Sequence, residues 1–160
     1  SERQASAERG VSELDAQRLA FWTAAREVFV ARKTFPSVRS PHGRMWMAFA
    51  TGHAPVELTL GAGFKHGRLR AKIEIDGRVT DVYERLLRER EAIEAELGLR
   101  FDWDPFPKKP TRTIRTSTSS IDIRESANWA AGIDWLADVG GRMHRVFVGR
   151  LDRYAKEKGA

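Results

Sequence analysis

Four basic residues stand close together in the chain, namely Lys65, Arg68, Arg70 and Lys72. Apolar residues alternate with the last three across residues 68–75. A period of two predicts a strand with one buried face and one basic face in water. Lysine and arginine side chains on such a face can contact phosphates and release their counterions. We therefore predict a surface that binds the backbone of DNA or RNA.

A second basic group follows later in the chain, on a loop at 105–110 and a strand at 111–118. Its members are Lys108, Lys109, Arg112 and Arg115, which we expect to extend the same surface. Aromatic residues that could stack on bases are few, because most tryptophans and phenylalanines fit the core. The sequence thus predicts binding without sequence specificity.

An alternative reading of the same strands is a degenerate PD-(D/E)xK-like nuclease. Such a site needs carboxylates that hold Mg²⁺ and a lysine that orients the attacking water. The chain offers Glu57, Glu74 and Lys72, but Lys72 precedes Glu74 where the motif requires the reverse order. Solvated strand faces explain these residues more simply.

Other residues with metal-binding or catalytic chemistry form no convincing set. Asp102 and Asp104 could share a strand face, and we expect that face simply to be wet. We expect three histidines to be turn residues at no metal-ligand spacing and the fourth to be packed or interfacial: His42, His53, His66 and His144. The chain has no cysteine, which excludes disulfides and thiolate sites. We predict no catalytic residue, metal or cofactor, and an enzyme is the less favoured reading.

Helical and strand periodicities alternate along the chain. They predict a helix from a capping box at 12–15 to about 32, strands at 44–51, 56–62 and 68–75, a helix at 80–98, strands at 99–104 and 111–118, and a long helix from Asn128. The strand at 44–51 is apolar on both faces, which favours a central position. Gly140 and Gly141 predict a kink or a close helix crossing.

These elements predict an α+β fold. A three-strand meander plus two further strands would form an antiparallel or mixed sheet packed with three helices. The 160 residues suit one domain, which we place at 12–157 after a disordered tail at 1–11. The chain begins with Ser1, which fits one domain of a longer protein.

The net charge of +6 is unevenly distributed. Residues 26–72 carry nine lysines or arginines against Glu27 and Glu57 alone, which suggests an anionic partner. An arginine-rich composition can also be a habit of the source. No apolar run is long enough to span a bilayer, so we expect no membrane association and a cytoplasmic protein.

Several motifs together resemble the bacterial domain-of-unknown-function family 4268, between about Leu19 and Leu151. They are Phe21-Trp22-Thr23, Trp46, RLRAKIEID before a helix ending in EAIEAELG, the strand with Trp103, Asn128-Trp129, Trp135-Leu136 and His144-Arg145-Val146-Phe147. The resemblance implies that such a domain often forms the C-terminal part of longer proteins. Their N-terminal part is similar to restriction-endonuclease-like nucleases of the PD-(D/E)xK type. The resemblance implies no activity.

The leading hypothesis is a non-catalytic accessory domain of a nuclease-like, defence-type system in bacteria. Its partners would be DNA or RNA and a nuclease-like domain in the same or another chain. The first alternative is a protein-interaction or homodimerisation module with no role in nucleic-acid binding. The second is the degenerate nuclease described above.

Overall fold

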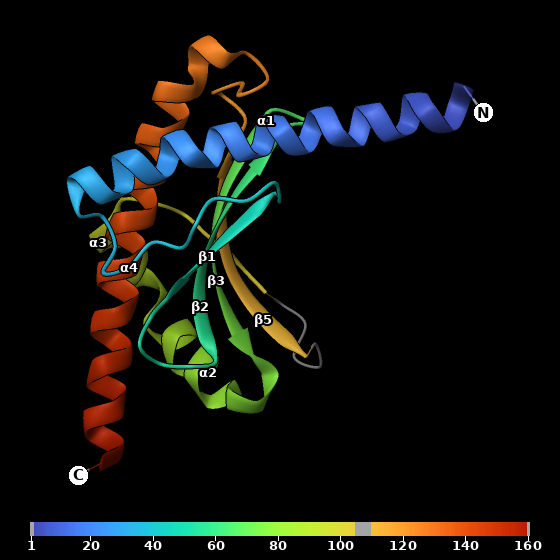
Figure 1. Cartoon of the computed structure of the whole chain (residues 1–160). Helices are drawn as coiled ribbons and strands as arrows, with labels where there is room; N and C mark the ends of the chain where they lie inside the picture. The colour runs from blue at the N-terminus through green and yellow to red at the C-terminus, as the bar shows by residue number, and fades with distance from the viewer. Residues whose placement is uncertain (1, 105–109, 160) are drawn as a thin grey trace.

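The computed structural model describes residues 2–104 and 110–159, which form one antiparallel sheet with helices (Figure 1). Short 3-10 turns, η1 and η2, precede two of the helices. The elements in chain order are α1 (Glu2–Arg32), β1 (Trp46–Ala50), β2 (Val56–Gly63), β3 (Arg68–Asp76), η1 (Gly77–Val79), α2 (Thr80–Arg88), α3 (Arg90–Leu97), β4 (Asp102–Trp103), β5 (Thr111–Thr118), η2 (Ser126–Asn128) and α4 (Trp129–Gly159).

The five strands follow the order β1-β2-β3-β5-β4, and every neighbouring pair is antiparallel. The predicted α+β class and the three-strand meander are confirmed. The expected central position of the first strand is wrong, because β1 lies at an edge. Its inner residues Met47 and Phe49 are buried. Its outer face is apolar for a separate reason, which is a contact of Trp46 with β2 described below.

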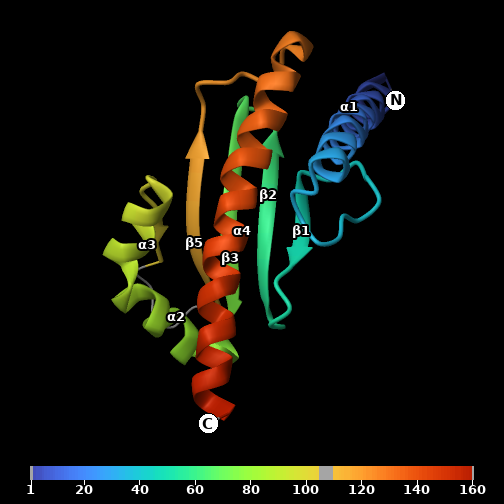
Figure 2. The ribbon, with the colours of Figure 1, turned by 90° about the vertical axis from the view of Figure 1, so that its left-hand side faces the viewer.

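One face of the sheet is covered by helices, and α4 runs along it (Figure 2). The alternation predicted for β3 is confirmed, since Leu69, Ala71, Ile73 and Ile75 are fully buried. Their side chains meet the buried stripe of α4, which includes Phe147. This burial of apolar area is the main stabilising contribution to the fold.

The paired glycines of α4 allow it to approach the sheet closely. A Cβ atom on Gly140 would lie 3.0 Å from Cδ2 of Leu60, and one on Gly141 would lie 3.0 Å from Cγ2 of Thr34. The helix runs through both glycines from Trp129 to Gly159. The close approach at these glycines is therefore to β2 and the loop after α1, whereas we expected a kink or a crossing with another helix.

Helix α1 ends at Arg32 as predicted, but it begins at Glu2 and not at Ser12. The segment from 2 to 9 consists mostly of Glu, Arg, Gln and Ala, which all favour helix. The C-terminal half of α1 buries Phe21 and Trp22, and the N-terminal half extends past the sheet (Figure 1). The division into a tail at 1–11 and a domain at 12–157 stays a prediction.

The helix predicted at 80–98 is divided in the structure. Glu89 separates α2 from α3 with φ −96° and ψ 11°. Among the described residues, the structure therefore has one α-helix more than we expected. The carboxylate of Glu89 is bound by Arg150 and Arg153 of α4. Gly98 ends α3 as its C-cap, in the left-handed region with φ 64°, which glycine adopts without strain.

Candidate nucleic-acid interface

The basic residues of β3 lie on the face of the sheet opposite α4. Strand register places Trp46, Gly61, Arg70 and Ser117 in one row across β1, β2, β3 and β5. The adjacent row runs from Ala48 through Thr59, Lys72 and Arg115 to Asp102 of β4. We call this surface the open face. It brings together residues from both basic groups of the sequence.

A hollow of about 300 Å³ lies on the open face and is lined largely by basic side chains. Its residues are Trp46, Arg68, Arg70, Lys72, Asp102, Arg115, Thr116 and Ser117. Four cations therefore border one concavity together with a single carboxylate. A concave basic surface concentrates anions more strongly than isolated surface charges do.

The four cations of this hollow differ in how far they are neutralised. Lys72 forms an ion pair with Glu74, with Nζ 2.8 Å from Oε1. Arg68, Arg70 and Arg115 have no ion-pair partner within residues 2–104 and 110–159. Their guanidinium groups keep five donors each in a planar fork that matches phosphate oxygens. The hollow thus offers three arginines that an anion could bind.

Trp46 forms one wall of the hollow by lying across Gly61. A Cβ atom on Gly61 would come within 2.6 Å of Cζ3 of Trp46 and within 3.0 Å of two neighbouring ring carbons. Only glycine leaves room for the ring at this position. Nζ of Lys72 lies 4.0 Å from the ring centroid, which is a cation–π contact. Sequence reasoning missed Trp46, because only strand register shows that it faces a glycine.

The structure corrects the prediction for Arg112. Arg112 is opposite Ile75 in the register and lies on the covered face, where it is 6% exposed. Its guanidinium donates to the backbone oxygen of Asp104 at 2.8 Å and lies 4.0 Å from the ring centroid of Tyr83. Burial raises the pKa of Tyr83, and the positive charge of Arg112 opposes this effect. Arg112 therefore contributes to the core and not to the open face.

The remaining predicted site residues fall in different places. Lys65 is exposed on the turn between β2 and β3 and lines a second hollow. Lys108 and Lys109 lie outside the described residues, so their predicted role stays a prediction.

Comparison with known proteins gives one match. The family described as "Domain of unknown function (DUF4268)" matches residues 17–151. The chain belongs to this family. No curated protein and no solved structure matches the chain. The open face of this DUF4268 domain, including the row from Trp46 to Ser117, lies within the matched residues.

The carboxylates considered for a nuclease do meet on the open face of the DUF4268 domain. Glu57 and Glu74 are direct neighbours across β2 and β3, and Lys72 pairs with Glu74. Within the described ranges, however, no group of three or more His, Cys, Asp or Glu residues could hold a metal. Asp104 is buried, whereas Asp102 is exposed, so this pair offers no shared wet face.

Three of the four histidines have structural contacts. His144 is buried, with Nε2 2.9 Å from the backbone oxygen of Ala50 and its ring packed edge-on against Phe35. Nε2 of His53 lies 2.6 Å from a carboxylate oxygen of Asp152. Nδ1 of His42 accepts from the backbone of Arg44 at 3.1 Å. The expectation that His144 is packed is confirmed.

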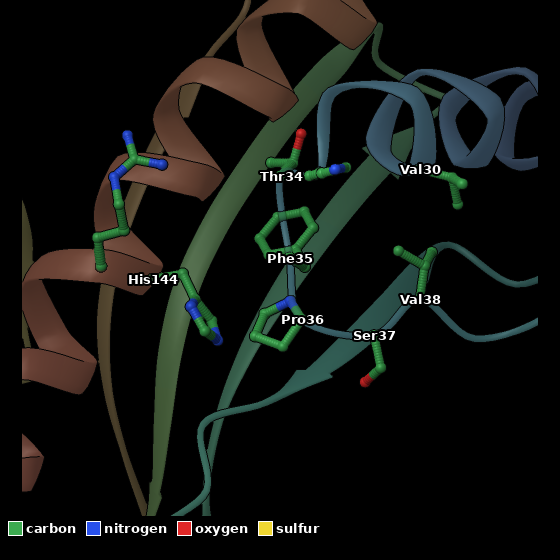
Figure 3. A pocket seen from close by; sticks show the side chains of 9 residues that line it. Val30, Thr34, Phe35, Pro36, Ser37, Val38 and His144 are labelled. Carbon is green, nitrogen blue, oxygen red and sulfur yellow. The ribbon is translucent and has the colours of Figure 1, made fainter.

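A larger hollow of about 550 Å³ lies between the end of α1, the loop after it and α4 (Figure 3). Val30, Phe35 and Val38 give this hollow a mostly apolar lining. Nε2 of His144, which also lines the hollow, already has a hydrogen-bond partner. Its charged lining residues are Lys33 and Arg145, fewer than the four cations that border the hollow on the open face. The open face therefore remains the stronger candidate site.

Several charged groups elsewhere in the domain pair with one another. Burial opposes the charge of Glu89, but hydrogen bonds from Arg153 and Tyr154 outweigh it and lower the pKa of the carboxyl. Burial and the bond to Glu89 raise the pKa of Tyr154 to about 12. On the surface, hydrogen bonds from Arg78 lower the pKa of Asp76 to about 2.

In the parts that the structure describes, no helix is long and apolar enough to cross a membrane.

Proposed function

We propose that the open face binds the phosphate backbone of DNA or RNA without reading its sequence. The observation that supports this most directly is the presence of Arg68, Arg70 and Arg115 in one hollow, without carboxylate partners in the described chain. Three adjacent cations of like charge repel one another, and an anion between them would remove that repulsion. Bidentate contacts from arginine to phosphate oxygens give both affinity and orientation.

The proposal extends to a biological role. The domain would act as a non-catalytic accessory unit beside a nuclease-like domain, in the same chain or in another, as part of a bacterial defence-type system in the cytoplasm. This part rests on the resemblance of the motifs described above and on the basic hollow. An accessory domain of this kind would hold the nucleic acid while the other domain cleaves it.

Fluorescence anisotropy with labelled DNA and RNA at low salt tests the backbone proposal. We expect binding in the micromolar range that weakens steeply as salt rises and depends little on sequence. A triple variant in which Arg68, Arg70 and Lys72 are each changed to Glu should bind nucleic acid much more weakly. It should also flatten the plot of log affinity against log salt by about 0.7 to 0.9 units for each phosphate that the variant no longer binds.

A matched control changes the net charge equally without touching the open face. Arg39, Arg88 and Arg145 are exposed and lie on the loop after α1 and on helices α2 and α4. Their joint replacement with Glu should leave most of the binding affinity intact. It should also reduce the slope of log affinity against log salt less than the open-face variant does. Equal losses in both triple variants would mean that only net charge matters, and the proposal of a specific surface would then be wrong.

A homodimerisation module is the second candidate function. It is favoured by the edge position of β1, since an edge strand can pair with a second copy of the chain. Leu19 and Val30 of α1 add exposed apolar side chains. Size-exclusion chromatography with light scattering distinguishes the two: a stable dimer that ignores nucleic acid would favour this candidate, and a monomer that binds nucleic acid would remove it.

A further inference from the structure

A second hollow adjoins the basic one on the open face. It has a volume of about 270 Å³, and its lining includes Arg18, Met45, Trp46, Phe64, Arg68 and Arg70. Trp46, Arg68 and Arg70 line both hollows. The two concavities therefore adjoin each other, with Trp46 and two arginines at their common border.

The two hollows differ in chemistry. Arginine, lysine and hydroxyl side chains dominate the first. The second has an apolar floor of Met45, Phe64 and the two glycines of β2, with polar groups at its margin. One of these polar groups, Arg18, pairs with Asp15, with Nη1 3.7 Å from Oδ1. One hollow thus suits a phosphate, and the adjoining one suits a flat apolar group that carries hydrogen-bond acceptors.

A nucleotide combines these two kinds of group. Its base has apolar faces and polar edges, and its phosphate is anionic. In a duplex, bases are paired and stacked away from the protein, whereas in a single strand they can turn outward and stack on aromatic side chains. The second hollow would be of no use to a protein that contacts only the outside of a duplex.

We infer that the ligand is a single-stranded nucleic acid, with a phosphate bound by Arg68, Arg70 and Arg115 and an unstacked base in the hollow beside Trp46. This inference rests on the proposed backbone binding and adds to it the strandedness of the ligand and a subsite for the base.

Three labelled ligands of equal length test the inference with the unmodified protein: about 12 thymidine nucleotides as a single strand, the same sequence as a duplex, and an abasic single strand. We expect the thymidine strand to bind about tenfold more tightly than either of the others at the same salt. That factor corresponds to one stacked base. The abasic strand keeps the phosphates, so its deficit measures the contribution of the base.

Substitution of Trp46 gives a second readout. The change Trp46→Leu keeps an apolar cover over Gly61 but removes the aromatic ring. It should reduce the preference for the thymidine strand over the abasic strand and leave abasic binding nearly unchanged. A preserved circular dichroism spectrum and melting temperature would show that the fold persists.

The outcomes separate the inference from the proposed function. If all three ligands bind equally and the Arg68, Arg70 and Lys72 variant loses binding, backbone binding stands and the base subsite is wrong. A duplex that binds more tightly than the single strand would overturn the inference in the same way. If no ligand binds, both proposals fail.

Discussion

Three arginines of the open face and three of the four arginines of α4 have different surroundings. In α4, Arg142 pairs with Asp138, while Arg150 and Arg153 share Glu89 with each other. Further carboxylates at positions 96 and 157 complete this network. On the open face, three arginines surround a hollow and have no carboxylate partner in the described chain.

The difference shows that arginine content alone does not mark a binding surface. Paired surface charges contribute only about 0 to 1 kcal/mol each, and their charge is largely neutralised for any partner at a distance. A group of unpaired like charges instead opposes folding slightly through its own repulsion. Retention of such a group in one concavity is easier to explain by an anionic ligand than by stability.

The largest expected effect is a loss of stability when a charged residue replaces an apolar one at the centre of the covered face of the sheet. Ile73 is fully buried on β3, so Ile73→Glu would place a carboxylate in the core without a partner. We expect a loss of roughly 4 kcal/mol or more, which is most of the free energy of unfolding of a domain near the lower end of the usual range of about 5 to 15 kcal/mol. Chemical denaturation monitored by circular dichroism measures it. A folded variant with normal stability would mean that the faces of β3 are assigned the wrong way round.

A second test uses two arginines of the same strand that point to opposite faces. Arg112→Ala removes the bond to Asp104 and the contact with Tyr83, and should cost about 2 kcal/mol of stability. Its Nε has no hydrogen-bond partner, which limits the effect. Arg115→Ala should change stability by less than about 0.5 kcal/mol but reduce the salt slope of nucleic-acid binding by about 1 unit.

The two measurements on these variants must diverge for the comparison to hold. Urea denaturation should identify Arg112→Ala as the destabilised protein, and anisotropy under folding conditions should identify Arg115→Ala as the weak binder. A binding defect in the folded Arg112→Ala protein would indicate that ligand reaches the covered face. The separation of the two faces would then be incorrect.

The smallest expected effect is a pH dependence confined to the helical layer. The pKa of Tyr154 is about 12 in the folded protein against an ordinary value of 10.0. Folding therefore favours the protonated phenol, and this contribution is complete below about pH 10 and is lost as pH rises toward 12. Tyr154→Phe should show a weaker decline of stability across that window in alkaline denaturation. A decline equal to that of the parent protein would exclude Tyr154 as its source.

Strand periodicity predicted much of the fold because it reports directly on burial. The alternation around Ile73 placed the faces of β3 correctly. It could also have placed Arg112, since Arg112 stands two residues before the buried Ile114 and therefore shares its face. Counting basic residues along β5 without regard to this alternation caused the error.

Features that depend on tertiary contacts were not predictable in the same way. The break at Glu89 accompanies ion pairs with α4, which lies far along the chain. The edge position of β1 was hidden because the apolar character of its outer face comes from Trp46. The ring of Trp46 finds its place through a partner on another strand, and no local pattern specifies which residue that is.

The packing of Trp46 on Gly61 also constrains how sequences of this family can diverge. Any side chain at position 61 would collide with the ring, so a glycine there and a large aromatic residue at position 46 depend on each other. Loss of the ring would release position 61 to accept alanine or larger residues, whereas a substitution at position 61 alone would displace the ring. The two positions should therefore covary. A relative in which both have changed would lack the aromatic ring over position 61 but would keep the sheet.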